Sequence, residues 1–245
     1  MKYWKSIMSP ADLTMVENLR KLMQRVSHHA DRKVRMALSK KIKGLYVILD
    51  PEFTDSNPIT LAEACLKGGA RIIQWRDKVR DKGEQLKYCE PLAALCSTYE
   101  AVFLVNDHAD LAVACGASGL HVGQHDLPIP IARQVLISDQ LIGNSNATVG
   151  EALKGKEEGV DYIAVGAMFP TLSKNNTRPA GLETLRRVRE MVDCPIVAIG
   201  GINEENVQQV IKTGADSVAV ISAVTKSKDP KEATKRLVGL IDRAQ

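Results

Sequence analysis

The chain has 245 residues, a length that suits one large α/β domain or two small ones. Apolar residues make up 44% of it and aromatic residues only 4%, so its core must be mostly Val, Ile, Leu and Ala, as in parallel sheets covered by helices. Of the 33 Lys and Arg residues, ten lie in residues 1–41 beside three acidic ones, which leaves the remainder acidic. Composition therefore gives no reason to expect a nucleic-acid partner.

The cysteines and the hydropathy pattern predict a reduced compartment. There are five cysteines, an odd number, and no C-x-x-C spacing; they are Cys65, Cys89, Cys96, Cys115 and Cys194. This pattern is typical of cysteines that stay reduced in the cytosol and pack as small, buried apolar side chains. No run of 18 apolar residues occurs, and the N-terminus lacks the apolar core of a signal peptide. We expect a cytoplasmic protein without a membrane partner.

Residues 1–40 are predicted to be a basic helical extension. Ser9-Pro10 is a plausible helix start, because Pro is favoured at the first helical position. Apolar residues recur at helical spacing from Leu13 to Ala30 and again at Val34 and Leu38. The extension could pack on the body of the protein or on a second subunit, which leaves a homo-oligomer open. A basic surface for a membrane or an acidic partner is the other interpretation.

From residue 41 to residue 245 the pattern alternates between short apolar runs and helical segments. The strand-like runs are 45–49, 71–75, 101–105, 119–122, 141–142, 162–165, 196–199 and 217–220. The helical segments are 59–67, 81–99, 108–115, 129–138, 148–158, 181–192, 203–213 and 229–243. Eight strand–helix pairs predict an α/β fold, a (β/α)8 TIM barrel that carries the N-terminal helical extension. A doubly wound open sheet is the runner-up.

In such a barrel the chemistry lies where the strands end, so the residues there are candidates for a site. After the second strand, Gln74, Arg76 and Lys78 alternate and would share one side. A guanidinium and an ammonium beside an amide suit a diphosphate. The alternative is a solvated strand end with a salt bridge to Asp77 or Asp81.

Carboxylates follow two consecutive strands. Asn106 and Asp107 end the third run, and Asp126 lies just beyond the fourth. Parallel neighbours would bring both carboxylates to one face, where hard oxygen ligands suit Mg²⁺. The alternative for Asp107 is a simple helix cap. His121 and His125 have an H-x3-H spacing that could suggest zinc, but this spacing spans a strand and a turn rather than a helix.

The second half of the chain offers hydroxyl groups and glycines. Ser145 follows the fifth strand, with Thr148 as the better candidate for the helix cap. A long polar loop over 170–178 follows the sixth strand, and its length is typical of a lid. Gly200-Gly201 follows the seventh strand and Ile221-Ser222 the eighth. A phosphate site after strands seven and eight is frequent in barrels.

Taken in order, these motifs resemble a known family. They are Gln74-x-Arg-x-Lys78, Asn106-Asp-x-x-Asp110, His121-x-Gly-Gln-x-Asp126, Pro170-Thr-x-Ser-Lys174, Ile199-Gly-Gly-Ile202 and Ile221-Ser222. The ordered set is similar to the thiamine-phosphate synthase family and covers about residues 43–243. Two departures are Ser173, where the family often has Thr, and Asn146-Ala147, where it often has a His. Residues 1–40 lie outside the resemblance.

The resemblance implies a barrel enzyme that joins hydroxymethylpyrimidine diphosphate to a thiazole phosphate, with Mg²⁺ as cofactor. The pyrimidine diphosphate would be held by Gln74, Arg76, Lys78, Asn106, Ser145 and Lys174. The thiazole phosphate would be held by Thr171, Ser173, Gly200, Gly201, Ile221 and Ser222. Asp107 and Asp126 would bind Mg²⁺. Arg76, Lys78, Ser145 and Lys174 would be the catalytic residues.

Three other functions remain open at this point. A thiazole tautomerase shares the barrel and the phosphate site, but we expect it to lack the Gln-x-Arg-x-Lys set and the aspartate pair. A regulatory protein that binds thiamine precursors without turnover would explain the basic extension. A barrel enzyme acting on another phosphorylated small molecule is the third alternative.

Overall fold

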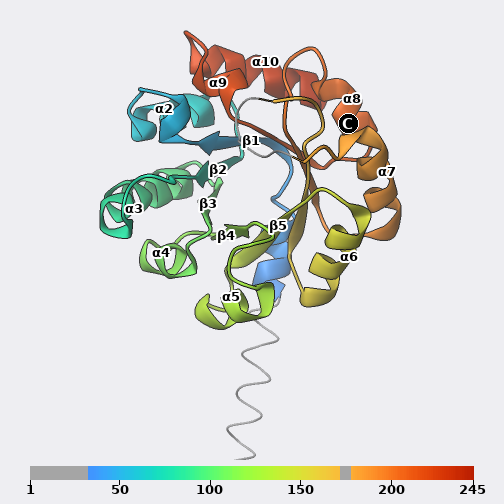
Figure 1. Cartoon of the computed structure of the whole chain (residues 1–245). Helices are drawn as coiled ribbons and strands as arrows, with labels where there is room; N and C mark the ends of the chain where they lie inside the picture. The colour runs from blue at the N-terminus through green and yellow to red at the C-terminus, as the bar shows by residue number, and fades with distance from the viewer. Residues whose placement is uncertain (1–32, 172–177) are drawn as a thin grey trace, which may run out of the picture.

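A computed structural model describes residues 33–171 and 178–245, and in this part of the chain eight parallel strands close into a barrel (Figure 1). The strands are β1 (Gly44–Leu49), β2 (Ile72–Trp75), β3 (Val102–Asn106), β4 (Gly119–Val122), β5 (Leu141–Asn146), β6 (Tyr162–Gly166), β7 (Ile196–Ile199) and β8 (Ser217–Val220). They pair in sequence order, and β8 closes the ring against β1. The predicted (β/α)8 barrel is confirmed, and the open-sheet alternative is wrong.

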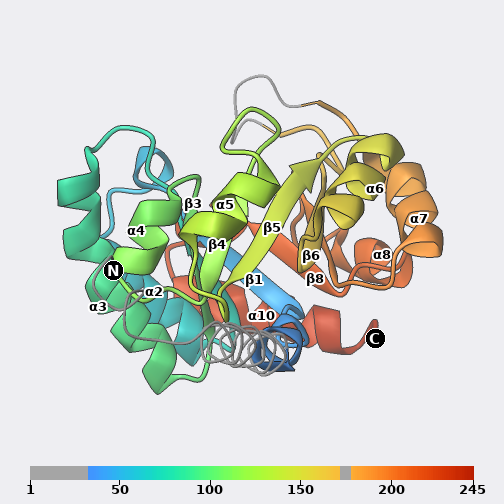
Figure 2. The ribbon, with the colours of Figure 1, turned by 90° about the horizontal axis from the view of Figure 1, so that it is seen from below.

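Helices follow the strands and surround the barrel, as Figures 1 and 2 show. They are α2 (Pro58–Lys67), α3 (Lys82–Thr98), α4 (Ala109–Ala114), α5 (Ile129–Val135), α6 (Val149–Glu158), α7 (Gly181–Met191), α8 (Val207–Lys212) and α10 (Pro230–Asp242). Two short elements were not predicted from the sequence, the 3-10 helix η2 (Pro51–Phe53) after β1 and α9 (Ser222–Thr225) after β8. No helix in the described ranges is long and apolar enough to span a membrane.

Side-chain caps fix where several helices begin. The side chains of Asn57, Asp81, Thr148 and Asp229 each accept a hydrogen bond from a backbone N–H in the first turn of α2, α3, α6 and α10, respectively. Such a cap satisfies a donor that has no partner inside the helix and stabilises it by about 1 kcal/mol. Thr148 is thus the cap of α6, as predicted, and Ser145 is left for another role.

Alternation along the strands separates two apolar layers. In β1, Leu45, Val47 and Leu49 pack in the large cluster between barrel and helices, whereas Tyr46 and Ile48 pack in a second cluster within the barrel. Period-two alternation sends successive side chains to opposite faces, so most strands contribute to both layers. Strand β4 contributes only to the outer layer, through Leu120 and Val122. The cysteines at 65, 89, 96 and 115 are buried, and all five are free thiols.

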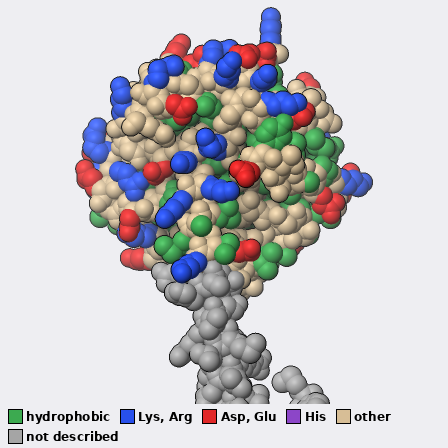
Figure 3. Space-filling view, turned by 180° about the vertical axis from the view of Figure 1, so that it is seen from behind, with side chains coloured by type: hydrophobic (Ala, Val, Ile, Leu, Met, Phe, Trp, Pro, Cys, Tyr) green, Lys and Arg blue, Asp and Glu red, His purple; other side chains and the backbone are tan. Residues whose placement is uncertain are grey.

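The helix at residues 33–39 is tied to the barrel at the end opposite the carboxyl ends of the strands. The Arg35 side chain donates through Nε to Asp161 Oδ1 at 2.9 Å and through Nη1 to the Ser138 carbonyl at 2.8 Å. Leu38 packs against the inner cluster. The rest of the predicted extension, residues 1–32, lies outside the described residues. On the face seen in Figure 3, charged side chains of both signs are interspersed.

Strand β5 is longer than predicted, which corrects the placement of Ser145. The predicted strand ended at residue 142, but β5 runs to Asn146, and Ser145 lies within it. Polar residues remain in this strand because they satisfy one another: Asn144 Nδ2 donates to Asn146 Oδ1 at 3.0 Å, and Asn146 Nδ2 donates to the Ala164 carbonyl at 3.2 Å. Buried amides with such partners do not destabilise a strand.

Candidate active site

The predicted site residues in the described part of the chain gather at the carboxyl ends of the strands. Gln74 lies in β2, with Arg76 and Lys78 just beyond it, and Asn106 ends β3. Asp107 and Asp126 follow β3 and β4, Ser145 lies near the end of β5, and Gly200, Gly201, Ile221 and Ser222 follow β7 and β8. Two predicted residues, Ser173 and Lys174, fall within 172–177 and lie outside the described residues.

The cations after β2 are paired with carboxylates across the mouth. Arg76 forms an ion pair with Asp50, which is fully buried at the end of β1, and Lys78 forms one with Asp107. The expected alternative, a solvated pair with Asp77 or Asp81, is wrong for both cations. Asp77 instead pairs with Arg80. A guanidinium and an ammonium held in this way remain near the mouth and can neutralise an anionic ligand.

Asp107 and Asp126 meet as the sequence predicted. Burial raises the pKa of Asp107, and the adjacent Asp126 carboxyl adds to this rise, whereas Lys78 opposes it. Burial would raise the pKa of Asp126 too, but hydrogen bonds with Asp107 and the Gly123 amide, at 2.7 Å, outweigh it and lower that pKa. Opposite shifts are typical of two carboxyls that share a proton. A divalent cation would replace that proton, so the donor set fits Mg²⁺.

Asp107 does not act as a helix cap. Helix α4 begins after His108, whose side chain makes no capping bond, and the Asp107 side chain is paired with Lys78. The Asp107 backbone has φ of 61°, a conformation that non-glycine residues rarely adopt and that concentrates at functional sites. Its N–H donates to the His121 carbonyl at 2.8 Å, which ties the turn to β4.

The zinc alternative gains no support. His121 is buried in β4, and its two ring nitrogens face Tyr162 and Ser145. Within residues 33–171 and 178–245, no group of three or more His, Cys, Asp or Glu side chains is arranged to hold a metal ion. A structural zinc needs four such ligands and a catalytic zinc three. The two-carboxylate site suits instead a cation that completes its shell with water and substrate oxygens.

Two buried polar groups inside the barrel face each other, but neither makes a hydrogen bond of good geometry within the described residues. They are the Gln74 Nε2 amide and the Tyr46 hydroxyl, on residues that are each 2% exposed. A buried donor without a partner costs about 1–3 kcal/mol. Since Gln74 lies two residues before the ion-paired Arg76 and its side chain faces the interior, a ligand atom that accepts a hydrogen bond there would recover part of this energy.

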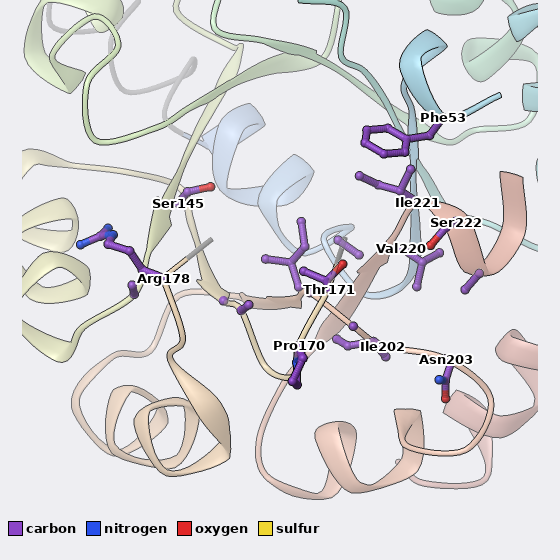
Figure 4. Close-up of a pocket in the computed structure, with 18 of the residues that line it drawn as sticks. Phe53, Ser145, Pro170, Thr171, Arg178, Ile202, Asn203, Val220, Ile221 and Ser222 are labelled. Carbon is purple, nitrogen blue, oxygen red and sulfur yellow. The ribbon is translucent and has the colours of Figure 1, made fainter. Parts of the chain in front are cut away.

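A pocket of about 910 Å³ opens over the carboxyl ends of β5 to β8. Figure 4 shows Ser145 and Arg178 on one side of it and Phe53, Ile221 and Ser222 on the other. Six predicted site residues line it: Ser145, Thr171, Gly200, Gly201, Ile221 and Ser222. The charged residues after β2 to β4 are not among its lining residues. The site therefore has two parts, an ion-paired cluster and an adjoining pocket, with Ser145 lining the latter.

Glycine is required at the turn after β7. Gly200 has φ of 101° and Gly201 has φ of 66°, both in the region that side chains disfavour. A Cβ on Gly200 would lie 2.7 Å from the Ala167 Cβ, and one on Gly201 would lie 2.6 Å from the Pro170 carbonyl oxygen. The turn therefore packs directly against the chain that leads from β6, and both segments line the pocket.

Sequence reasoning missed three residues that the structure brings to the site. Asp50 holds Arg76, while Phe53 and Lys226 line the pocket, with the Lys226 Nζ 5.9 Å from the centre of the Phe53 ring. Asp50 directly follows β1, which is the same signal that identified Asn106 and Asp126. Phe53 ends the short helix η2 and Lys226 caps α9, two elements that were not predicted, so no comparable signal marked these residues.

The fold and this mouth define the class: a (β/α)8-barrel protein with its candidate site at the carboxyl ends of the strands. Residues 45–224 match the family model described as thiamine monophosphate synthase. The chain therefore belongs to that family.

Individual relatives agree with this family. The chain is 41% identical to a thiamine-phosphate synthase of Synechocystis sp. over 81% of the chain and 57% of the relative's length. It is 41% identical to one of Chlorobium limicola over 76% of the chain and 90% of the relative. A solved thiamine phosphate pyrophosphorylase of Pyrococcus furiosus is 38% identical, with a TM-score of 0.79 over 84% of this chain and 98% of that one.

Proposed function

We propose that the chain performs the thiamine-phosphate synthase reaction with the residues gathered at the barrel mouth. The reaction class, a transferase of thiamine biosynthesis, follows from the family. In it, a pyrimidinylmethyl diphosphate and a thiazole phosphate give thiamine phosphate and pyrophosphate. The C–O bond to the diphosphate breaks, and the thiazole nitrogen forms a bond to the freed methylene carbon.

The diphosphate end of the first substrate belongs in the ion-paired cluster. Arg76 and Lys78, with Lys174 as a further candidate, would neutralise the charge that grows on the leaving group. Asn106 and Gln74 complete this set, and the buried Gln74 amide would donate a hydrogen bond to the pyrimidine ring. Ser145 lies across the mouth on β5 and would face the same ring. Little proton transfer is needed, because the amino group of the pyrimidine can delocalise the positive charge left on the methylene.

Asp107 and Asp126 would hold Mg²⁺. The cation supplies charge neutralisation at the departing diphosphate. The observation that supports it is the adjacency of two carboxyls beside Lys78, with opposite pKa shifts. The two carboxyls would bind the cation, while Lys78 orients Asp107 and the Gly123 amide orients Asp126.

The thiazole phosphate belongs in the adjoining pocket. Thr171, Gly200, Gly201, Ile221 and Ser222 line it, and Ser173 is a further candidate. Glycines let the backbone approach a phosphate closely, and the start of α9 adds backbone amides there. The observation that carries the assignment is that His121 connects the two parts: its Nε2 lies 2.9 Å from the hydroxyl of Ser145, which lines the pocket, and its carbonyl accepts the Asp107 N–H. Two substrates bound in the two parts would therefore meet end to end.

The decisive experiment is turnover by the full chain with both substrates and Mg²⁺. We expect thiamine phosphate and pyrophosphate to form, product formation to stop with EDTA, and excess Mg²⁺ to restore it. Product that is unaffected by EDTA would contradict the metal assignment alone. Binding of both substrates without any product under all conditions would contradict the proposed reaction and favour the regulatory alternative.

A further inference from the structure

Three interior residues lie in one row across neighbouring strands. His121 on β4 pairs in register with Gly143 on β5, and Gly143 pairs with Tyr162 on β6. In a barrel, residues in register lie side by side on the same face of the sheet. His121 and Tyr162 therefore flank a position that carries no side chain.

Because Gly143 has no side chain, the side chains of His121 and Tyr162 can contact each other. A Cβ on Gly143 would lie 1.9 Å from the Cζ atom of the Tyr162 ring, so the ring occupies the space that any other residue would fill. The His121 and Tyr162 rings are stacked with centroids 5.7 Å apart, and the His121 Nδ1 lies 2.8 Å from the Tyr162 hydroxyl. Tyr162 is fully buried.

The other nitrogen of the same imidazole reaches the mouth. Ser145 lies two residues beyond Gly143 on β5 and so points to the same side of the sheet. Its hydroxyl oxygen is 2.9 Å from the His121 Nε2. The three side chains thus form a continuous hydrogen-bonded chain from the barrel interior to the wall of the pocket.

The order of protons in this chain follows from its chemistry. A neutral imidazole donates through one nitrogen and accepts through the other. The Tyr46 hydroxyl also faces that of Tyr162, but an imidazole nitrogen is a stronger acceptor than a phenol oxygen, so we assign the Tyr162 proton to Nδ1. A phenol is also a stronger acid than an aliphatic alcohol, so Tyr162 is a better donor to the imidazole than Ser145. Nε2–H then donates to the Ser145 oxygen, which leaves the Ser145 proton pointing outward. Burial raises the pKa of Tyr162, so its proton is retained at any working pH.

We propose that His121 and Tyr162 are positioning residues that fix the Ser145 hydroxyl as an outward donor toward the pyrimidine. This inference rests on the proposed function, in which Ser145 faces that ring. His121 also accepts the Asp107 N–H with its carbonyl, so one residue of β4 holds both a substrate-facing hydroxyl and a metal-binding turn. A Phe at position 162 would pack equally well, so packing alone does not account for the hydroxyl.

The test is Tyr162→Phe, which keeps the ring and removes the donor. We expect kcat to fall about five- to tenfold, as loss of one hydrogen bond predicts, with the KM for thiazole phosphate unchanged. Tyr88→Phe is the matched control, because Tyr88 stacks on Trp75 outside the barrel interior, and it should behave as wild type. A Tyr162→Phe enzyme with wild-type kcat would overturn the proposal.

A double-mutant cycle separates positioning from a general structural role. If Tyr162 acts through Ser145, adding Tyr162→Phe to a Ser145→Ala enzyme should leave kcat unchanged. An equal fold-loss in both backgrounds would mean that Tyr162 acts by another route and would overturn the proposal. Both results require a wild-type enzyme that turns over. If the proposed function is wrong, the wild type itself will be inactive, which distinguishes that failure from failure of this inference.

The proton order can be tested in the ligand-free full chain. In a ¹⁵N-labelled histidine sample, with the His121 signal assigned by His121→Gln, we expect the Nε2–H tautomer. Tyr162→Phe should shift the Nδ1 resonance, and Tyr88→Phe should not. The Nδ1–H tautomer in the wild type would overturn the assigned donor order, whether or not the enzyme turns over.

Discussion

The two halves of the barrel mouth hold their functional groups in different ways. On the β1 to β4 side, the cations of Arg76 and Lys78 form ion pairs with the carboxylates of Asp50 and Asp107, respectively. On the β6 to β8 side, the pocket is shaped by backbone that packs closely at Gly200 and Gly201. The first half depends on side-chain electrostatics and the second on the absence of side chains.

This difference shows which half is incomplete without a ligand. The charged half contains two adjacent carboxyls and a buried Gln74 amide whose contact with the Tyr46 hydroxyl is not a hydrogen bond of good geometry, and both features are costly until a cation and a ligand atom meet them. The glycine half already makes its hydrogen bonds: the Phe169 N–H donates to the Gly200 carbonyl at 3.0 Å, and Asn206 Nδ2 donates to the Gly201 carbonyl at 3.0 Å. Substitutions in the two halves should therefore affect kcat, KM and stability differently.

The largest effect is expected on the charged side, from Asp107→Asn or Asp126→Asn. Loss of one carboxylate ligand should lower Mg²⁺-dependent kcat about a hundredfold or more, because the cation stabilises the leaving group by several kcal/mol. The measurement is turnover as a function of Mg²⁺ concentration. Asp110→Asn is the control, since Asp110 pairs with Lys82 at the surface and should retain activity. Full Mg²⁺-dependent turnover by Asp107→Asn would contradict the assignment of Asp107 as a Mg²⁺ ligand.

The next largest effect is expected on the glycine side, from Gly201→Ala. The new Cβ would press against the Pro170 carbonyl, so we expect about a 30-fold rise in the KM for thiazole phosphate and a loss of about 1–3 kcal/mol in stability. Gly116→Ala separates crowding from backbone strain, because Gly116 has φ of 64° with nothing within 4 Å of its Cβ. Equal effects of the two substitutions on this KM would show that crowding at the turn does not matter.

Removal of a single cation should give a smaller effect, confined to one substrate. Lys78→Met should lower kcat/KM for the pyrimidine diphosphate about tenfold, because Lys78 would neutralise charge that grows on the leaving group and one charge-assisted hydrogen bond contributes about 1.5–3 kcal/mol before solvent screening. The KM for thiazole phosphate should stay unchanged. Lys82→Met removes a comparable cation from the exposed pair with Asp110 and is the control. A similar loss for both substrates would mean that the two halves of the mouth are not independent.

The same contrast explains what the sequence could predict. Apolar runs of strand length that end in polar residues fix the barrel, because eight buried parallel strands leave that pattern. Asn106, Asp107 and Asp126 were found because polar residues cluster where the apolar runs of β3 and β4 end. Ser145 was found but placed beyond its strand, since the Asn144 and Asn146 amides that satisfy each other do not resemble strand residues.

Other features depend on closure of the barrel and could not be read from local patterns. The His121–Tyr162 contact joins residues 41 positions apart and exists only because Gly143 leaves space between them. The Arg76–Asp50 pair likewise needs β1 and β2 in their observed register. Side chains that meet across strands are specified by register, and register follows from the closed sheet rather than from any one segment.

The smallest predicted effect concerns the border between the halves, where Glu151 and Arg178 meet. Glu151, in the first turn of α6, accepts a hydrogen bond from Arg178 Nη1 at 2.6 Å, and it also accepts one from the Ala147 N–H at 2.8 Å. Arg178 lines the pocket and leads into α7. The Arg178 guanidinium lowers the pKa of Glu151, although partial burial opposes this shift.

A lowered pKa means that the folded state releases its proton more readily than the unfolded chain. The stabilisation is therefore complete above the usual glutamate pKa of 4.5 and is lost as pH falls through the lower folded value. Because Arg178 is half exposed, we expect only about 0.5–1 kcal/mol. Glu151→Gln should lower the melting temperature slightly at pH 7, and this difference from wild type should shrink as the pH falls below 4.5.

The matched control is Glu183→Gln, because Glu183 also lies in the first turn of a helix and pairs with an arginine, Arg186, at the surface. It shares the interaction with the helix dipole but not the contact with the pocket wall. A pH-dependent difference of the same size in both variants would assign the effect to the helix ends. A difference confined to Glu151→Gln would show that the stabilisation comes from the Glu151–Arg178 ion pair, which connects the end of β5 to the chain that enters α7.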